Sequence, residues 1–286
     1  MAERIRQLIA DKGRLLEQAG IDQGRTEIEL ILCHLLKVDR LNLYQGGAHL
    51  IDDSVLKRLD EIVSRRVSRY PLQYILGESW FYGRRFHVSP KVMIPRPETE
   101  VLCETAIRFA GEAGMTSPRV LDLGVGSGVI SVTVACELEH CSVLALDISE
   151  EALRVAKMNT AELGAADRIE FCQSDFFASV EQGWTFDLIL SNPPYISGEE
   201  YKSLPPEVLA DPEVSLLGGE DGLDAIKVIL RSAPAFLAEG GLVILEIGDN
   251  QADRVAELAA DDGRYRAAAR IKDLSGVDRV IMLSRA

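Results

Sequence analysis

The chain has 286 residues, 47% hydrophobic and 27% charged, which is long enough to bury a core as an ordinary globular protein. Its formal net charge of −14, from 31 basic and 45 acidic residues, disfavours the broad basic surface that captures nucleic acid. Because no apolar run approaches ~20 residues, no N-terminal stretch resembles a signal peptide, and five scattered cysteines form no CxxC pair, we expect a cytoplasmic protein that spans no membrane.

Residues 1–70 carry apolar side chains at helical spacing, as in Ile28, Ile31, Leu32 and Leu35. This spacing predicts a small helical N-terminal domain. Packing against the rest of the protein is its simplest role, and recognition of a macromolecular substrate is the functional alternative. A local group of basic residues near its end favours the second role, although a solvated face explains such a group equally simply. The group comprises Arg65, Arg66, Arg69, Arg84 and Arg85.

Residues 71–97 have a different composition, with aromatic and β-branched residues around glycine in the segment 80–88. This composition predicts a β-hairpin that links two domains. Pro97 suits the first turn of a following helix, where its missing N–H costs nothing. Glu98 and Glu100 suit the positive end of the same helix.

Residues 98–286 alternate between strand and helix patterns from residue 118 onward. The alternation predicts an α/β fold with a doubly wound, mostly parallel sheet of seven strands. The predicted strands cover residues 119–122, 142–146, 169–171, 186–190 and 242–247, and a terminal hairpin covers 265–271 and 279–283. The predicted helices lie at about 129–138, 150–163 and 222–238.

A glycine-rich turn, Gly124-Val125-Gly126-Ser127-Gly128, lies between the first of these strands and the following helix. Glycines there let a ligand approach the backbone, and the helix N-terminus offers unpaired N–H groups. Val129 takes the last position of the GxGxxG pattern of dinucleotide binders, which argues against NAD. Asp147 ends the second strand about twenty residues further on and is placed to bind two ribose hydroxyls. A helix N-cap shared with Ser149 is the alternative interpretation.

Two more candidates follow the third and fourth strands. Asp175 and Phe176 are placed to contact an adenine edge and face, although a core position explains Phe176 equally well. Asn192-Pro193-Pro194-Tyr195 follows the strand 186–190. The prolines hold the backbone extended, which leaves carbonyl groups and the Asn192 side chain free to accept hydrogen bonds. A rigid turn is the simpler interpretation of this segment alone. Since ligands bind beyond the carboxyl ends of parallel strands, we expect all these candidates to meet at one sheet edge.

Together, the glycine turn, Asp147 and the Asn-Pro-Pro-Tyr segment resemble those of class I S-adenosylmethionine-dependent methyltransferases. More narrowly, the chain resembles the peptide chain release factor glutamine N5-methyltransferases (PrmC/HemK) over nearly its whole length. Two positions depart conservatively from the family pattern, with Val125 where threonine is usual and Phe176 where tryptophan is also seen. The most specific matching segments are 71–77, 80–83, 94–100, 192–196 and 245–248, with Gln251.

The resemblance implies a Rossmann-like methyltransferase domain joined by the hairpin to an N-terminal helical bundle. It also implies methyl transfer from S-adenosylmethionine to the side-chain amide of the glutamine in the Gly-Gly-Gln motif of release factors, which modulates translation termination. The implied cofactor-binding residues are Gly124, Val125, Gly126, Ser127, Gly128, Asp147, Asp175, Phe176 and Asn192. The implied catalytic and substrate-binding residues are Asn192, Pro193, Pro194 and Tyr195.

The residue types agree with this chemistry. An amide nitrogen is a poor nucleophile, because its lone pair is delocalised into the carbonyl group. We hypothesise that the Asn192 side-chain oxygen and the Pro193 carbonyl accept its two N–H hydrogens, while Tyr195 packs on the amide plane. No general base is evident. We expect no metal, since the four histidines form no ligand cluster. They are His34, His49, His87 and His140.

Three other functions fit part of the pattern. The same two acceptors, the Asn192 side-chain oxygen and the Pro193 carbonyl, also suit an exocyclic amine of adenine or guanine in DNA or ribosomal RNA. Enzymes that act on such amines hold or flip a base, however, and usually need a basic surface. A non-catalytic binding module with this fold is disfavoured by the intact glycine turn, Asp147 and Asn192. An NAD-dependent oxidoreductase is disfavoured by the glycine spacing.

Overall fold

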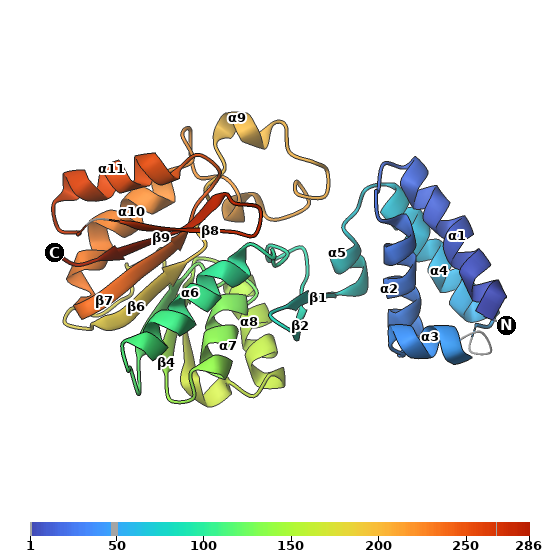
Figure 1. Cartoon of the computed structure of the whole chain (residues 1–286), viewed down its shortest axis with the longest axis horizontal. Coiled ribbons are helices and arrows are strands. Elements are labelled where there is room, and N and C mark those ends of the chain that lie inside the picture. Colours follow the sequence, from blue (N-terminus) through green and yellow to red (C-terminus); the bar gives the residue numbers. More distant parts are fainter. Residues whose placement is uncertain (1, 47–50, 267) are drawn as a thin grey trace. The chain divides into compact units, whose positions relative to one another are not determined.

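The computed structural model describes residues 2–46, 51–266 and 268–286 and divides the chain into two compact units (Figure 1). The first unit comprises Met1–Gly77 together with Pro205–Ala210, and the second comprises Glu78–Leu204 and Asp211–Ala286. Each unit has its own hydrophobic core. None of the helices in the described ranges is long and apolar enough to cross a membrane.

The first unit is helical, as the sequence predicts. Leu16, Ile28, Leu32 and Leu59 are fully buried between its helices, because the helical spacing of these residues places them on inward faces. The Asp52 side chain caps the fourth helix by accepting from the backbone N–H of Val55. The helices are α1 (Ala2–Gln18), α2 (Gly24–Leu36), α3 (Arg40–Gly46), α4 (Asp53–Val67) and α5 (Leu72–Leu76).

Helix α5 was not predicted, because its residues lie at the start of the segment 71–97 that we interpreted as a hairpin. Pro71 precedes the helix, and Gly77 ends it in the left-handed conformation with φ of 75°. Leu72 and Tyr74 are buried. Pro71 and Gly77 therefore bound a short helix, and the β structure begins only after Gly77.

Arg66 carries the buried positive charge of the first unit. Its guanidinium contacts Glu27 at 2.8 Å and Glu207, from the segment Pro205–Ala210 of the same unit, at 3.0 Å. Burial alone would raise the pKa of Glu207, but hydrogen bonds from Arg69 and Arg66 hold that pKa at about 2. The Glu207 carboxylate therefore stays ionised and paired at neutral pH.

Replacement of Arg66 by alanine is expected to lower the free energy of unfolding of the first unit by about 1.5–3 kcal/mol, because it leaves the partly buried Glu27 carboxylate without its guanidinium partner while Glu207 keeps Arg69. Arg58→Ala, at an exposed position of the same helix, is the matched control and should cost less than about 0.5 kcal/mol. Urea unfolding followed by circular dichroism measures both variants. Equal costs for the two variants would contradict the assigned role of Arg66.

The second unit begins with the predicted hairpin, which consists of β1 (Glu78–Phe81) and antiparallel β2 (Arg84–His87). Tyr82 and Gly83 form the two-residue turn, with φ of 49° and 71°. Positive φ at both positions matches the twist of the two strands. The following helix α6 (Thr99–Glu112) begins two residues after Pro97.

The predicted seven-stranded, mostly parallel sheet is confirmed, with the order β5-β4-β3-β6-β7-β9-β8. The five strands from β5 to β7 run parallel, and the terminal hairpin of β8 and β9 adds two antiparallel strands. The strands are β3 (Arg119–Leu123), β4 (Ser142–Asp147), β5 (Ile169–Gln173), β6 (Phe186–Ser191), β7 (Leu237–Glu246), β8 (Ala269–Lys272) and β9 (Asp278–Ser284).

Helices cover both faces of this sheet, which makes the fold doubly wound (Figure 1). Successive residues of β3 point to opposite faces, so that Val120 belongs to one core and Leu121 to the other. Helices α6, α7 (Val129–Glu137) and α8 (Glu150–Glu162) pack on the first face. Helices α10 (Asp224–Ser232) and α11 (Ala252–Asp262) pack on the second.

Several element boundaries differ from the sequence prediction, and β8 begins at Ala269, four residues later than expected. The helix expected at 222–238 ends at Ser232, because Pro234 interrupts the helical hydrogen bonds, and β7 begins at Leu237. Helix α11 was not predicted, although Val255 and Ala259 are buried at helical spacing. The short helix α9 (Gly198–Tyr201) lies in the long connection after β6 and was also not predicted.

Candidate active site

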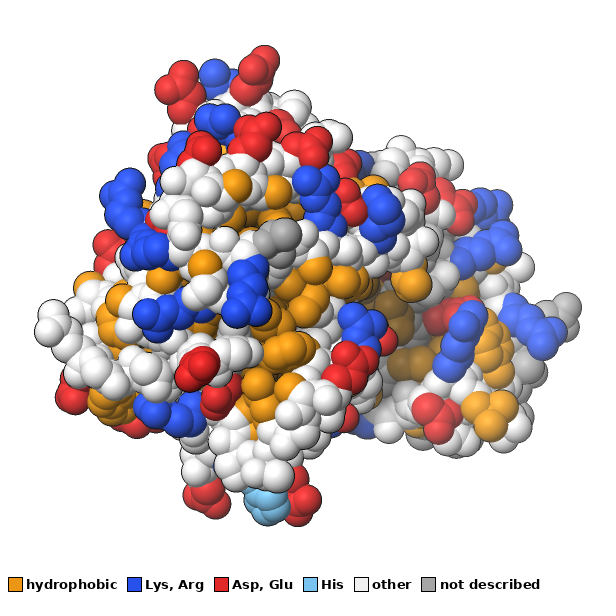
Figure 2. All heavy atoms as spheres, turned by 60° about the vertical axis from the view of Figure 1, so that its left-hand side comes forward, with side chains coloured by type: hydrophobic (Ala, Val, Ile, Leu, Met, Phe, Trp, Pro, Cys, Tyr) orange, Lys and Arg blue, Asp and Glu red, His pale blue; other side chains and the backbone are white. Residues whose placement is uncertain are grey.

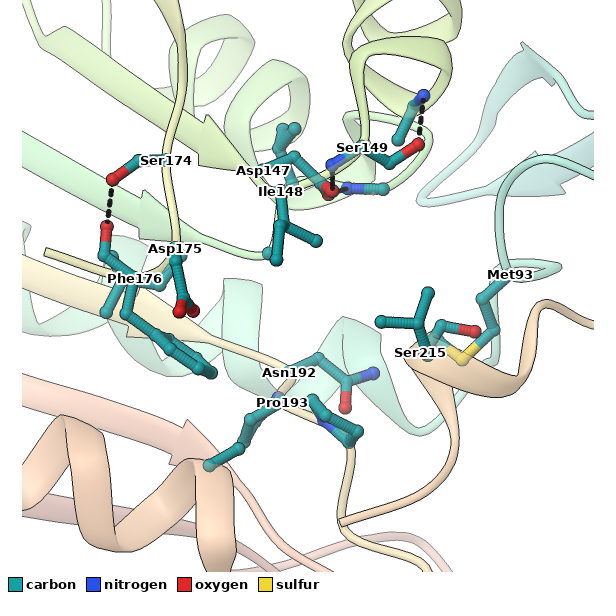
Figure 3. Close-up of a pocket in the computed structure, with 18 of the residues that line it drawn as sticks. Met93, Asp147, Ile148, Ser149, Ser174, Asp175, Phe176, Asn192, Pro193 and Ser215 are labelled. Atoms are coloured by element: carbon teal, nitrogen blue, oxygen red, sulfur yellow. Dashed lines mark hydrogen bonds between the residues drawn. The ribbon is translucent and has the colours of Figure 1, made fainter. Parts of the chain in front are cut away.

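The candidate site lies where the chain order of the sheet reverses, between β3 and β6. These strands are parallel neighbours, with Leu123 opposite Ser191, and the Ser191 hydroxyl donates to the Leu123 carbonyl at 2.7 Å. Connections leaving the two strands diverge to opposite faces, which opens a crevice at their carboxyl ends. A cavity of about 1140 Å³ lies here (Figure 3).

Most of the predicted site residues line this cavity, whereas Gly128 and Tyr195 do not. Figure 3 shows Asp147, Asp175 and Asn192 on three sides of the open space. The predicted residues in the lining are Gly124, Val125, Gly126, Ser127, Asp147, Asp175, Phe176, Asn192, Pro193 and Pro194.

The glycine turn needs glycine because its three glycines have φ of 77°, 54° and 87°, in the region that other residues rarely adopt. The amides of Gly124 and Val125 both donate to the Leu146 carbonyl of β4, at 2.8 and 2.9 Å. A Cβ on Gly128 would lie 3.2 Å from the Cβ of Ala156 in α8, whereas a Cβ on Gly124 would meet nothing within 4 Å. Gly128 therefore serves helix packing, and Gly124 leaves space at the cavity.

Gly128→Ala and Gly124→Ala form a matched pair, because both alanines would have similar backbone strain of ~1–2 kcal/mol. We expect Gly128→Ala to unfold more readily, since its methyl group crowds Ala156. Gly124→Ala should instead lose affinity for a ligand of the cavity by about tenfold or more. Thermal unfolding and ligand titration of the two variants test this division, which the reverse pattern would contradict.

Asp147 lies at the cavity with both carboxylate oxygens engaged by backbone N–H groups. Oδ2 accepts from Gly126 at 2.9 Å and Oδ1 from Ser149 at 2.8 Å. Burial raises the pKa of Asp147, against the effect of these hydrogen bonds. Ser149 alone caps α8, through the N–H of Ala152. Asp147 therefore is not the cap, and each of its oxygens keeps a lone pair for a ligand hydroxyl.

Phe176 faces the cavity in a strained conformation. Its φ is 46°, which is uncommon for an aromatic residue, and the Ser174 hydroxyl holds its carbonyl oxygen at 2.8 Å. The next residue, Phe177, is 8% exposed and stacks on Phe236 at a centroid distance of 5.1 Å. Both phenylalanines border the cavity, but Phe177 is buried in the core, whereas Phe176 is only partly buried against that core and faces the open space (Figure 3).

Asn192 and Pro193 present two hydrogen-bond acceptors at the cavity. The Asn192 amide nitrogen donates to the Thr99 hydroxyl oxygen at 3.1 Å, which leaves the side-chain oxygen Oδ1 available. Among the described residues, no donor is found for the Pro193 carbonyl oxygen either. Figure 3 shows the Asn192 amide and the Pro193 ring side by side at the base of the open space.

Tyr195 lies differently from our expectation that its ring packs on a substrate amide. It is not part of the cavity lining, and its hydroxyl donates to Glu246 of β7 at 3.1 Å. Its carbonyl accepts from the Gln251 side chain at 2.9 Å, and burial raises the pKa of its hydroxyl. The segment 192–195 forms no helix or turn, and along it Asn192 lines the cavity whereas Tyr195 does not. Tyr195 therefore anchors the segment to the sheet.

The chain matches two family models, the PrmC N-terminal domain over residues 7–77 and the methyltransferase small domain over residues 105–216. A release factor glutamine methyltransferase of Cereibacter sphaeroides is 41% identical over 267 residues, which cover 93% of both chains. One from Neisseria gonorrhoeae is 39% identical, over 90% of this chain and 92% of its own. This chain belongs to the release factor glutamine methyltransferase family.

A solved structure of a methyltransferase from Pyrococcus furiosus shares the fold, with a TM-score of 0.52 and 18% identity over 81% of this chain and 98% of its own. Family and fold make this release factor glutamine methyltransferase homologue an S-adenosylmethionine-dependent enzyme. Its residues fit that cofactor. Gly124 leaves space beside the cavity, Asp147 can accept two hydroxyl groups, and Phe176 offers an aromatic face.

Two buried residues that support the site were not predicted. Asn159 of α8 is 1% exposed and donates to the carbonyls of Ser127 at 2.8 Å and His87 at 3.0 Å, which joins the glycine turn to the hairpin. Asp211 is 4% exposed and holds the N–H of Ile94 at 3.1 Å and the guanidinium of Arg96 at 2.5 Å. The segment 94–100 is thereby tied to the loop 212–219 at the cavity.

The signal for Asn159 was a polar residue inside a predicted helix, whereas Asp211 lies in a connection for which the sequence predicts no element. Metal ligands do not gather in the part of the chain that the structure describes, where no group of three histidine, cysteine or acidic residues could hold an ion. His49 lies outside the described residues. The five cysteines are free thiols.

Proposed function

We propose that this protein transfers a methyl group from S-adenosylmethionine to the side-chain amide nitrogen (N5) of the glutamine in the Gly-Gly-Gln motif of peptide chain release factors. S-Adenosylhomocysteine is the second product, and the modification modulates translation termination. The observation that carries the proposal is the pair of acceptors at the cavity, Asn192 Oδ1 and the Pro193 carbonyl. The names of the relatives support the choice of substrate.

In this proposal, the two acceptors bind the two N–H hydrogens of the glutamine amide. These hydrogens become more acidic as the nitrogen attacks, so that the same two hydrogen bonds strengthen in the transition state. Pro193 and Pro194 fix the backbone, which holds the acceptors in place before the substrate enters. Tyr195 holds the segment in place through the hydrogen bond from its hydroxyl group to Glu246, and its ring does not contact the substrate amide.

The cofactor lies, in our proposal, along the glycine turn 124–128, with Asp147 on its ribose hydroxyls. Asp175 and Phe176 bind its adenine edge and face. The bound cofactor supplies a methyl group that its positively charged sulfur already activates, so the chain's own residues need only position the reactants and exclude water. The proposal assigns no residues to a metal site.

The helical residues 1–70 recognise the protein substrate in this proposal, with residues 71–97 as a linker and residues 98–286 as the methyltransferase domain. A negatively charged protein with buried apolar cores suits the cytoplasm, where release factors act. Figure 2 shows basic and acidic side chains interspersed on the face that it displays. This surface and the net charge of −14 disfavour a nucleic-acid amine as the substrate.

Mass spectrometry of a release factor after incubation with the enzyme and S-adenosylmethionine tests the proposal. We expect a gain of one methyl group (~14 Da, the mass of CH₂) on the glutamine of the Gly-Gly-Gln motif. A release factor with alanine at that glutamine is the matched control and should gain nothing. If the wild-type factor gains no mass while calorimetry shows cofactor binding, the proposed substrate is wrong, and DNA and ribosomal RNA become the next substrates to assay.

A further inference from the structure

Glu246 carries a fully buried carboxyl group close to the two acceptors of Asn192 and Pro193. Glu246 ends β7, whose Leu245 is paired with Ser191 of β6, so that Glu246 and Asn192 leave adjacent strands at the same edge. Its side chain is 0% exposed. Oε1 accepts from the Tyr195 hydroxyl, whereas Oε2 has no hydrogen-bond partner among the described residues. A buried acceptor left without a donor is costly and calls for an explanation.

Thr99 lies between this carboxyl group and Asn192. It is the first residue of α6 and is 2% exposed. Its hydroxyl oxygen accepts from the Asn192 amide nitrogen at 3.1 Å, and the same hydroxyl group lies near enough to the Glu246 carboxyl group to lower its pKa. We infer that the hydroxyl hydrogen of Thr99 turns toward Oε2, the one carboxyl oxygen of Glu246 that has no other partner among the described residues. The result is a chain of donors from Asn192 through Thr99 to Glu246.

The direction of this chain decides which end of the Asn192 amide faces the cavity. An asparagine side chain can turn over about its terminal bond, so packing alone does not distinguish the nitrogen from the oxygen. An ionised carboxylate only accepts, so Thr99 must donate to it and then can accept only from an N–H group. The Asn192 nitrogen is therefore held inward, and its oxygen is left for the ligand.

We propose that Glu246 is a positioning residue that acts through Thr99 to hold the Asn192 amide with its oxygen toward the substrate. This inference rests on the proposed function for the identity of the substrate. The hydrogen-bond chain itself is a property of the free enzyme. It can therefore be tested separately from catalysis.

The charge state of Glu246 provides the readout. Burial raises the pKa of Glu246 to about 7, while hydrogen bonds from Thr99 and Tyr195 oppose the shift. The charged and titratable groups around it are Arg279 of β9, which lowers the pKa, Glu98 before α6, which raises it, and the buried thiol of Cys103. Below pH 7 the protonated carboxyl group can itself donate to Thr99. The hydrogen bonds from Asn192 through Thr99 to Glu246 then no longer fix the orientation of the Asn192 amide.

Side-chain amide NMR of the full-length, ligand-free enzyme tests the chain. The Asn192 signals are assigned by their absence from Asn192→Asp. In the wild type, we expect the Asn192 Nδ2 signals to shift with a midpoint near pH 7. Glu246→Gln and Thr99→Val should abolish this shift, whereas Thr99→Ser should retain it. An Asn192 signal that does not titrate in the wild type, or that titrates unchanged in Thr99→Val, overturns the proposal.

Methyl transfer to a release factor gives the second readout. We expect Thr99→Val and Glu246→Gln to lower kcat about 10- to 100-fold with KM for S-adenosylmethionine within about twofold, and Thr99→Ser to restore most of the loss. Thr105→Val, a buried threonine on the same helix, is the matched control for folding. Wild-type kcat in both variants overturns the proposal. If the wild type methylates no release factor, the proposed function fails, and the NMR titration still decides the inference.

Discussion

Asn192→Ala is expected to lower the rate of methyl transfer by about 10³-fold. The variant removes one of two acceptors that bind the amide most strongly in the transition state, and it releases the alignment of the nitrogen with the methyl group. Cofactor affinity should stay within about tenfold, because Asp147 and the glycine turn are unchanged. Single-turnover assays and calorimetry on the same preparations measure the two effects.

Asn192→Asp is the informative second variant at this position. It keeps an oxygen at the cavity but cannot donate to Thr99. We therefore expect its rate of methyl transfer to lie between the rates of the wild type and of the alanine variant. Turnover of Asn192→Ala equal to that of the wild type would remove Asn192 from the mechanism. Parallel losses of turnover and cofactor affinity would show instead that Asn192 serves binding.

Asp147→Ala is expected to weaken S-adenosylmethionine binding by about 10²-fold or more. Each hydrogen bond from a ribose hydroxyl to a carboxylate contributes roughly 1.5–3 kcal/mol, and the variant also frees the N–H groups of Gly126 and Ser149. Burial raises the pKa of Asp147, so that this carboxylate becomes protonated at a higher pH than an exposed aspartate. As the pH is lowered, the affinity of the wild type for S-adenosylmethionine should therefore begin to fall at that higher pH.

Calorimetric titration at several pH values measures both effects. Asp167→Ala, which removes an exposed carboxylate after α8, is the control for the change in net charge and should bind normally. An affinity loss below about threefold in Asp147→Ala would contradict its assignment to the ribose hydroxyls.

The sequence predicts the parts of this site that depend on local rules. Strands end where apolar runs end, and parallel strands place their carboxyl ends together, so the meeting of Gly124, Asp147 and Asn192 at one cavity could be expected. Glycines with positive φ are likewise a local requirement. The seven-stranded sheet follows from the same regularity, because each predicted strand has a clear apolar run.

Side-chain directions after the strands depend on packing that the sequence does not display. We expected Tyr195 to lie against the substrate amide beside Asn192, but its hydroxyl group instead donates to the buried Glu246 of the next strand. Thr99 and Glu246 lie far apart in the chain and meet only because α6 packs beside β7. An acidic residue inside the apolar run 242–247 was the available signal for Glu246, since carboxyl groups are rarely buried without a role.

The composition of the first unit has a consequence for the order in which the protein folds during its synthesis. Its core helices are complete once residue 77 has been made, but the segment Pro205–Ala210 belongs to the same unit. Arg66 therefore has Glu27 available early and must wait for Glu207 until most of the second unit has been translated. An N-terminal bundle that emerges first from the ribosome therefore reaches its final stability only after residue 207 has been made, when β7, β8 and β9 are still to be translated.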